Sequence, residues 1–321
     1  MHALRWNAVL RQWVVFSTDR QNRPQMPANW CPFDPGSGKV PDNYDVYIYP
    51  NDFPGFSAVS PPFVEMAMPG LFAENGPRGA CDVVLYSPQH TLPPSQLTLE
   101  NWAKIVDVWT KRTAEHAANP EIAMVCVFEN CGDAVGVTMP HPHGQIYAIP
   151  FIAPTVEKEI ESARLHAETS GGECLFCRLL TEERAQKSRI VSGDEYFTAF
   201  VPFAARFPAE IAIYARRHVR TLLDLTAEEK SSLASNISVI RRKYDDLYGF
   251  MLPLMMVVKQ APLQDASAPY HFHVQFLPLQ RSATKLKYLA TMETGYGSFL
   301  ADTAPEEMAE NLRKSKPETN G

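Results

Sequence analysis

Pro140-His141-Pro142-His143-Gly144-Gln145-Ile146 is a histidine-rich stretch near the middle of the chain, and a related stretch, Tyr270-His271-Phe272-His273-Val274-Gln275-Phe276, lies nearer its end. On an extended backbone the two imidazoles of a His-x-His pair project from the same face. Gly144 has no Cβ, so a bulky anion can approach the main chain, and Gln145 adds an amide that both donates and accepts. Such a strand could hold a phosphate against an attacking imidazole. A His-x-His pair on its own more often marks structural histidines, so the rest of the chain has to decide.

The two stretches belong to a longer internal repeat. Both histidines and the glutamine recur at an offset of 130 residues (141 to 271, 143 to 273, 145 to 275), while a lone His and a helix-starting Thr recur at 128 (90 to 218, 98 to 226). Several residue types at nearly one offset indicate a duplication. We therefore predict an α+β fold of two tandem halves, each an antiparallel sheet with a packed helix. The division is expected near residues 160–172, which gives halves of 1–168 and 169–321.

Each half has a helix signal followed by a strand signal before its His-x-His stretch. A helix of about twenty residues is predicted from Thr98, with an apolar stripe of one helical face. A second helix is predicted from Thr226, where Thr226 and Glu229 have the form of a capping box, and Gly249 suits its end. The apolar stretches 121–128 and 252–258 read as buried strands, and a turn is expected at 129–132.

Composition and charge exclude several classes of protein. The chain has 321 residues, 45% of them hydrophobic and 21% charged, which is typical of a globular protein with one large or two ordinary domains. A formal net charge of -6 argues against nucleic acid as the main partner. No apolar run approaches the roughly 18 residues of a membrane span, and the N-terminus lacks the pattern of a signal peptide. The six cysteines are therefore expected to be reduced or metal-bound, and the location to be cytoplasmic.

Metal ligands are predicted in both halves, in the same order along the chain. Cys174, Cys177, His218 and His271 form a Cys2His2 set that matches the tetrahedral preference of zinc, and with four protein ligands the site would be structural. The alternative is two buried thiols with unrelated histidines. The corresponding residues of the first half are Cys31, Asp34, His90 and His141. Aspartate in place of a thiolate weakens affinity for a thiophilic ion, so the occupancy of this first set stays open. We expect one or two structural zinc ions per chain.

The motifs together resemble a known family. Phe128-Glu129-Asn130 precedes the His-Pro-His-Gly-Gln stretch, and Pro278-Leu279-Gln280-Arg281-Ser282-Ala283-Thr284 precedes Lys287. Further matching segments occur in the same order; they are Arg5-Trp6-Asn7, residues 19–24, Asn51-Asp52-Phe53 and Ser87-Pro88-Gln89-His90. In these features the chain resembles the galactose-1-phosphate uridylyltransferases, the transferase branch of the histidine-triad superfamily. The resemblance extends to about residue 313.

The resemblance implies a ping-pong nucleotidylyl transfer. His143 would attack the α-phosphorus of UDP-glucose, expel a sugar 1-phosphate and carry UMP as a uridylyl-histidine, which galactose 1-phosphate then takes up. A neutral imidazole is nucleophilic near pH 7, and a covalent intermediate divides one hard exchange into two steps. Gln145 stands where the histidine-triad hydrolases carry a third histidine. An amide is neither a general acid nor a general base, which favours transfer over hydrolysis.

Substrate contacts and a partner subunit are also implied by the resemblance. The residues that resemble uridine-nucleotide and phosphate contacts are Arg20, Arg23, Asn51, Asp52, Asn130, Gly136 and Thr138. Lys287 and Glu293 resemble sugar-phosphate contacts. Ordinary turn chemistry would also explain the Asn, Asp and Gly positions. The family implies a homodimer, because the partner subunit helps to complete the sugar site.

Departures from the family keep other functions open. Gln260 occupies a position where some members have an iron-binding histidine, so no iron is predicted. Residues 294–299 differ from the best-known enzymes where the hexose would bind, which leaves the sugar undecided. The Cys-x-x-Cys pair is similar to that of ADP-glucose phosphorylases. An NDP-sugar phosphorylase on the same scaffold is therefore an alternative function, and a nucleotide-binding zinc protein without catalysis is a weaker one.

Overall fold

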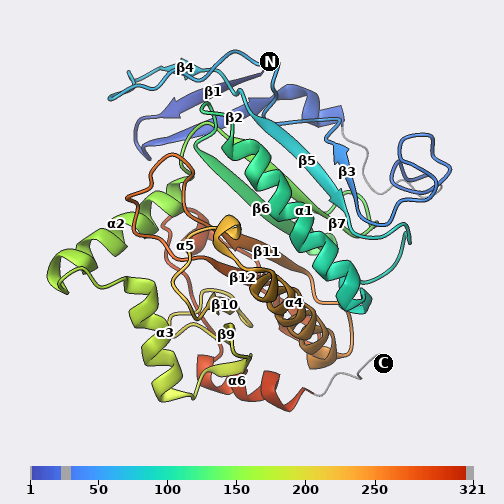
Figure 1. The fold of residues 1–321 in the computed structure, drawn as a ribbon, viewed down its shortest axis with the longest axis vertical. Coiled ribbons are helices and arrows are strands. Elements are labelled where there is room, and N and C mark those ends of the chain that lie inside the picture. Colours follow the sequence, from blue (N-terminus) through green and yellow to red (C-terminus); the bar gives the residue numbers. More distant parts are fainter. Residues whose placement is uncertain (1, 23–29, 316–321) are drawn as a thin grey trace.

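A single antiparallel sheet of nine strands extends through the molecule in the order β3-β5-β7-β6-β11-β12-β10-β9-β8 (Figure 1). The computed structural model describes residues 2–22 and 30–315. Its strands are β1 (His2–Asn7), β2 (Gln12–Ser17), β3 (Tyr47–Pro50), β4 (Glu74–Asn75), β5 (Ala80–Leu85), β6 (Met124–Cys131), β7 (His143–Ile149), β8 (Ile190–Gly193), β9 (Phe197–Phe200), β10 (Ile211–Ala215), β11 (Leu254–Lys259), β12 (His273–Pro278), β13 (Gln280–Ser282) and β14 (Lys285–Leu286). Its α-helices are α1 (Leu99–Ala117), α2 (Pro154–Thr169), α3 (Leu175–Gln186), α4 (Ala227–Tyr248), α5 (Thr291–Thr294) and α6 (Pro305–Lys314).

The predicted α+β fold of two histidine-triad-like halves is confirmed, with one addition. The sheets of the halves join edge to edge, because β6 of the first half pairs with β11 of the second, Val127 facing Val258 and Cys131 facing Leu254. The prediction for residues 121–132 was wrong in detail. The strand starts at Met124 and continues to Cys131, since the segment expected to turn is instead held in the ladder with β11.

Helices α1 and α4 lie side by side across one face of the sheet (Figure 1). Thr98 caps α1, where its side chain accepts from the Asn101 N–H at 3.1 Å. Thr226 and Glu229 form the predicted capping box of α4, and Gly249 ends that helix in the left-handed region with φ 79°. Both predicted helices are therefore confirmed at their N-termini, and α4 also at its C-terminus.

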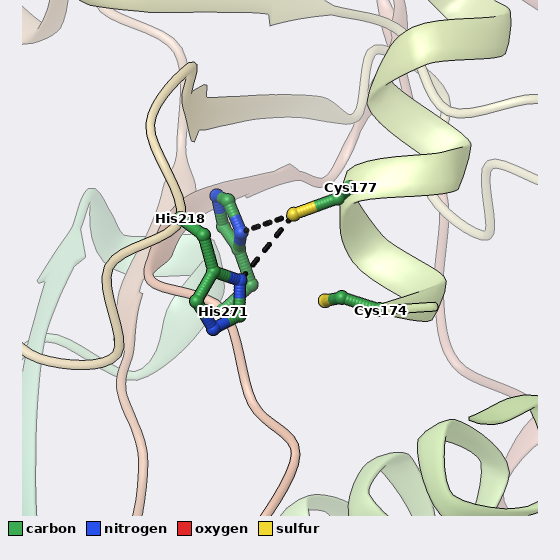
Figure 2. Close-up of side chains that lie close together, drawn as sticks. All are labelled: Cys174, Cys177, His218 and His271. Atoms are coloured by element: carbon green, nitrogen blue, oxygen red, sulfur yellow. Dashed lines mark hydrogen bonds between the residues drawn. The ribbon is translucent and has the colours of Figure 1, made fainter. Parts of the chain in front are cut away.

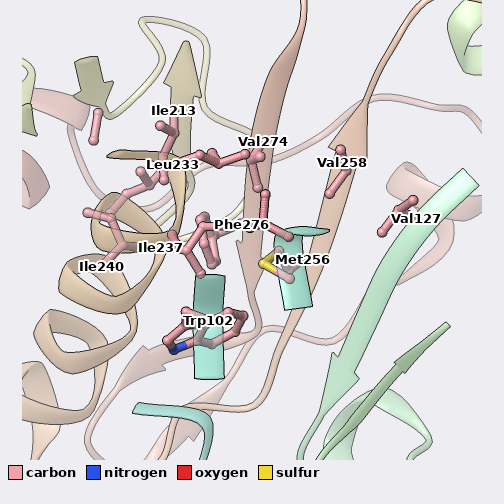
Figure 3. Close-up of a cluster of buried hydrophobic side chains, with 14 of the residues drawn as sticks. Trp102, Val127, Ile213, Leu233, Ile237, Ile240, Met256, Val258, Val274 and Phe276 are labelled. Atoms are coloured by element: carbon pink, nitrogen blue, oxygen red, sulfur yellow. The ribbon is translucent and has the colours of Figure 1, made fainter. Parts of the chain in front are cut away.

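The main core lies between these two helices and the sheet (Figure 3). Trp102 of α1 and Leu233 and Ile237 of α4 meet side chains from strands of both halves, including Val127 and Phe276. Nearly all of these side chains are fully buried. Burial of this apolar surface from both halves is the largest favourable term that holds them together.

The opposite face of the sheet is covered by α2 and α3. Val156 and Ile160 of α2, and Phe176 of α3, pack with Tyr214 and Tyr270 in a second core. His143 and His273 are the first residues of β7 and β12, so His141 and His271 lie just before those strands. Within the described part of the chain, no helix combines the length and the apolar character that crossing a membrane would require.

Candidate active site and metal clusters

The His143 ring is half-buried at the start of β7, and one of its nitrogens forms a hydrogen bond with the main chain just before the strand. Its Nδ1 lies 2.7 Å from the main-chain oxygen of His141. A carbonyl oxygen can only accept, so Nδ1 carries the hydrogen and donates it. In the neutral ring Nε2 therefore keeps its lone pair, which is the form that a nucleophilic imidazole requires.

A pocket at this end of the sheet brings His143 together with four other residues predicted from the sequence. Asn51 and Asp52 follow β3, Thr138 precedes the histidine stretch, and Gln145 lies two residues along β7. The remaining walls are formed by Pro32, Phe33, Tyr49, Phe53, Val83 and Met139. Five polar predicted residues thus share one partly enclosed space with an apolar wall, which is the usual composition of a small-molecule site.

Hydrogen bonds hold the polar residues of the pocket in place. The Tyr147 hydroxyl donates to Gln145 Oε1 at 3.0 Å, and the Tyr49 hydroxyl donates to Asp52 Oδ2 at 2.8 Å. Asn51 Oδ1 accepts from the Phe53 N–H at 2.9 Å. Because Tyr147 donates to the side-chain oxygen of Gln145, the NH2 group of Gln145 is the part that can donate to a ligand.

Phe33 and Tyr49 are wall residues that the sequence did not reveal. The Phe33 ring centroid lies 5.6 Å from that of His143 and 5.9 Å from that of His141, so the ring packs against both histidines. Phe33 lies between Cys31 and Asp34, two of the predicted metal ligands. Its position in the sequence could therefore have placed it near the site, because residues between two ligands lie close to the metal that those ligands bind.

Other predicted contacts do not line this pocket. Arg20 Nη1 donates to the Phe53 carbonyl at 3.2 Å, and so supports the loop that carries Asn51 and Asp52. Asn130 pairs with Met255 across the β6–β11 ladder, and Gly136 has φ 77°, the left-handed region that favours glycine. Arg23 lies outside the described residues.

Lys287 and Glu293 are buried and form an ion pair with each other. The distance from Lys287 Nζ to Glu293 Oε1 is 3.0 Å, and Nζ also donates to the Leu300 carbonyl at 2.7 Å. The hydrogen bond from Lys287 lowers the pKa of Glu293 to about 2. Neither residue lines the pocket that contains His143 in the same chain.

The four predicted ligands of the second half converge. Cys174 and Cys177 come from the start of α3 and face His218 and His271, as Figure 2 shows. Cys177 Sγ lies 3.3 Å from His218 Nδ1 and 3.4 Å from His271 Nδ1. Two such ligands on one tetrahedral zinc ion would be about 3.5 Å apart, so the separations fit a shared ion.

Protonation states at this second cluster also fit a metal. His271 Nε2 donates to the Ala215 carbonyl at 2.8 Å, which leaves the lone pair on the Nδ1 that faces Cys177. Burial lowers the pKa of His271 to about 4, and burial together with Cys174 raises the pKa of Cys177 to about 12. Without a cation this would be a neutral thiol against a neutral imidazole, and a metal would displace the thiol proton.

The predicted ligands of the first half also converge, and here two hydrogen-bond acceptors are placed against each other. His141 Nε2 donates to the Ser87 carbonyl at 2.7 Å, so its bare Nδ1 faces the Asp34 carboxylate at 3.1 Å. His90 Nδ1 contacts the same carboxylate oxygen at 2.8 Å. Burial lowers the pKa of His141 despite these partners, which keeps the ring neutral. Two acceptors then face each other, and a bound cation would satisfy both.

His273, the counterpart of His143, has a different environment. The rings of Tyr214, Phe176 and Tyr270 lie 4.6, 5.6 and 6.0 Å from it, centroid to centroid, and the side chain is fully buried. Burial lowers the pKa of His273 to about 3. The space that would correspond to the pocket is filled with aromatic side chains, so His273 is a core residue.

Comparison with known proteins covers almost the whole chain. Residues 30–153 match the N-terminal domain of galactose-1-phosphate uridyl transferase, and residues 158–318 match its C-terminal domain. The galactose-1-phosphate uridylyltransferase of Thermotoga maritima is 38% identical, over 99% of this chain and 100% of that protein. The enzyme of the same name from Rattus norvegicus is 30% identical, over 97% of this chain and 86% of its own length.

Solved structures agree with these matches. One described as a uridylyltransferase superposes with a TM-score of 0.88 at 30% identity, covering 98% of both chains. An ADP-glucose phosphorylase from Arabidopsis thaliana has a TM-score of 0.76 at 23% identity, covering 98% of both chains. This second likeness shows a shared fold.

Proposed function

Because the chain belongs to the galactose-1-phosphate uridylyltransferase family, we propose that it is a transferase that exchanges UMP between UDP-glucose and galactose 1-phosphate. The observation that carries the proposal is the His143 ring, whose Nδ1 is bonded to the His141 carbonyl while the side chain lines a pocket with four polar residues. This geometry leaves one ring nitrogen able to attack a phosphorus atom held in the pocket.

The reaction proceeds in two steps with one covalent intermediate. His143 Nε2 attacks the α-phosphorus of UDP-glucose, an N–P bond forms, and the bond to the oxygen of glucose 1-phosphate breaks. A phosphate oxygen of galactose 1-phosphate then attacks the same phosphorus, and the N–P bond breaks to give UDP-galactose. Positive charge that develops on the imidazole is stabilised through Nδ1 by the His141 carbonyl at 2.7 Å. The Gln145 amide donates to a phosphate oxygen and has no proton to supply for hydrolysis.

Substrate contacts are proposed for the remaining predicted residues. Asn51, Asp52 and Thr138 would contact the nucleotide within the pocket, with Arg20, Arg23, Asn130 and Gly136 around it. Lys287 and Glu293 would act on the sugar phosphate of the partner subunit's site in a homodimer, since they do not line the pocket of their own chain. Sedimentation of the purified protein at the mass of two chains would support this, and a monomer that keeps full activity would contradict it.

Each metal cluster is proposed to bind one structural zinc ion. Cys174, Cys177, His218 and His271 would hold one ion between α3 and the sheet, and Cys31, Asp34, His90 and His141 would hold the other behind the pocket. The ions would brace the structure and take no part in transfer. Gln260 is fully buried and its amide donates to the Val125 carbonyl at 3.0 Å, so we expect zinc without iron on elemental analysis.

The location and the domain division also stand as proposals. We propose the cytoplasm, where thiols that bind a metal stay reduced, and a division between residues 168 and 169. Fragments cut at that division would share the β6–β11 ladder, so they are expected to associate when they are co-expressed.

Trapping the covalent intermediate tests the function. UDP-glucose labelled at the α-phosphate is mixed with the protein, and acid-labile label on the protein is expected from the wild type. His143→Ala should lose the label, whereas His166→Ala, which changes a histidine of α2 outside the pocket, should keep it. A chase with galactose 1-phosphate should release UDP-galactose. Release by inorganic phosphate alone would instead identify a phosphorylase, and labelling that persists in His143→Ala would contradict the mechanism.

A further inference from the structure

A buried ion pair connects the two halves close to the histidine stretch. Arg241 on α4 belongs to the second half, Glu129 on β6 belongs to the first, and the distance from Nη2 to Oε1 is 2.9 Å. Their side chains are 3% and 1% exposed. Burying two charges is costly, and apolar residues of the same size are often at least as stabilising. Stability alone therefore does not explain why this ion pair is buried here.

Tyr86 connects this ion pair to the residues on both sides of His143. It is fully buried next to Glu129, and burial together with the Glu129 charge raises its pKa well above the ordinary value. Its main-chain N–H donates to the Pro142 carbonyl at 3.0 Å. Its hydroxyl lies 2.1 Å from the point where a Cβ on Gly144 would be, so the absence of that Cβ lets the tyrosine pack directly on β7.

We propose that Glu129, Arg241 and Tyr86 form a positioning unit that sets the direction of the His143 ring from behind the sheet. This inference rests on the proposed function, because it assumes that His143 reacts with the nucleotide. Arg241 pairs with Glu129, the Glu129 charge acts on the buried Tyr86 hydroxyl, and Tyr86 contacts Pro142 through its main chain and Gly144 through its hydroxyl. The His141 carbonyl, which accepts from the His143 ring, is joined directly to Pro142. The hydrogen bond from Tyr86 to Pro142 therefore also restrains this carbonyl.

The expected consequence is kinetic. Displacing a reacting group by about 1 Å can lower a rate a hundredfold, even when the altered residue touches no substrate. The nucleotide contacts proposed within the pocket, Asn51, Asp52 and Thr138, lie on other segments than Glu129, so substrate binding should change much less than transfer. The unit also makes the second half, through Arg241, necessary for the nucleophile of the first.

A matched control exists at the other end of the molecule. Glu183 on α3 and Arg189 form a second buried pair, each 5% exposed, with Nε to Oε2 at 2.9 Å. It lies beside β8, the edge strand farthest from β3 in the sheet order. Glu183→Gln removes one buried carboxylate from beside an arginine, as Glu129→Gln does, but away from His143; Arg189 keeps its contact with Glu306 at 2.6 Å.

The experiment compares Glu129→Gln and Glu183→Gln in the full chain by single-turnover labelling with UDP-glucose, together with KM and the thermal midpoint. Both variants should lose stability. Only Glu129→Gln should slow label transfer, by about tenfold or more, with KM changed less than about threefold. Glu129→Gln with Arg241→Met removes both charges; it should recover stability but not the transfer rate.

Three results would overturn the proposal. These are an unchanged transfer rate in Glu129→Gln, an equal loss of rate in Glu183→Gln, or recovery of the rate by the neutral double variant. If Glu129→Gln does not fold, Tyr86→Phe decides, because a normal rate in that variant would refute the positioning role. Labelling of the wild type tests the proposed function separately, since a wild type that never labels refutes that function whatever the variants do.

Discussion

His141 and His143 are two residues apart and have two different environments. His141 is fully buried and turns its Nδ1 toward Asp34, while His143 is half-buried and faces the pocket. They are linked because the main-chain oxygen of the first accepts from the ring of the second. The main chain of His141, a proposed metal ligand, thus orients the ring of His143, the proposed nucleophile. The direction of the His143 ring therefore depends on that hydrogen bond.

Gly144→Ala is predicted to be harmful through packing rather than through a phosphate contact. The new Cβ would lie 2.1 Å from the Tyr86 hydroxyl and 3.1 Å from the Phe128 carbonyl oxygen, and Tyr86 is fully buried. Overpacking of this kind lowers the free energy of unfolding by about 1 to 3 kcal/mol. Urea unfolding would measure the loss. Adding Tyr86→Phe should recover part of it, and an additive double variant would contradict the stated contact.

At the scale of elements, strand β5 is attached to helix α1 by one buried carboxylate. Asp82 Oδ2 accepts from Arg112 Nε at 3.0 Å and Nη2 at 2.6 Å, and lies 3.4 Å from His116 Nε2. Burial alone would raise the pKa of Asp82, but the hydrogen bonds from His116 and Arg112 outweigh it and hold the pKa below its ordinary 3.8. The ionised form is therefore the one that stabilises the packing of α1 on the sheet.

This shift predicts a loss of stability in acid. Because the pKa of Asp82 is lower in the folded state, its contribution is complete above the unfolded value of 3.8 and is lost as the pH falls through the folded pKa. Asp82→Asn should lower the free energy of unfolding at pH 7 by about 1 to 3 kcal/mol. The difference from wild type should shrink between about pH 5 and pH 2. Chemical unfolding across that range would measure it, and a constant difference would argue against the assignment.

At the scale of the whole molecule, the continuous sheet makes the two halves one mechanical unit. Core side chains from both halves meet under α1 and α4, and the two metal clusters lie before β7 and β12, on different parts of that sheet. Loss of either cluster should therefore weaken the entire fold. Only the first cluster adjoins the His143 segment, so only its loss should also slow the transfer reaction proposed for His143.

Metal removal tests this inequality. Where free zinc exceeds its Kd a hundredfold, bound zinc adds about 3 kcal/mol to the stability of the folded state, so chelation should lower the thermal midpoint. Cys177→Ser should reproduce the loss of stability and keep label transfer to His143 in the folded protein. His90→Ala should lower both, because His141 then loses the arrangement that holds its carbonyl against His143. Full labelling in folded His90→Ala would contradict this coupling.

The sequence by itself determined the parts of this protein that depend on local spacing. The duplication followed from residues recurring at one offset, and the helix starts at Thr98 and Thr226 followed from capping patterns that act within a few residues. The two groups of four metal ligands could also be proposed, because their residue types and order repeat between the halves, and the structure brings each group together.

The tertiary structure alone decided how the halves combine. The β6–β11 ladder joins strands more than a hundred residues apart, and strand edges carry no local signal of their partner, so the extra pairing at Glu129 and Cys131 was missed. The same is true of Arg241, whose place on an amphipathic helix says nothing of a carboxylate on another strand. Tyr49 lines the pocket only because its strand, β3, pairs with β5 in the sheet that also contains β7. Contacts between distant segments depend on the whole set of packing choices, and no single stretch of sequence contains that information.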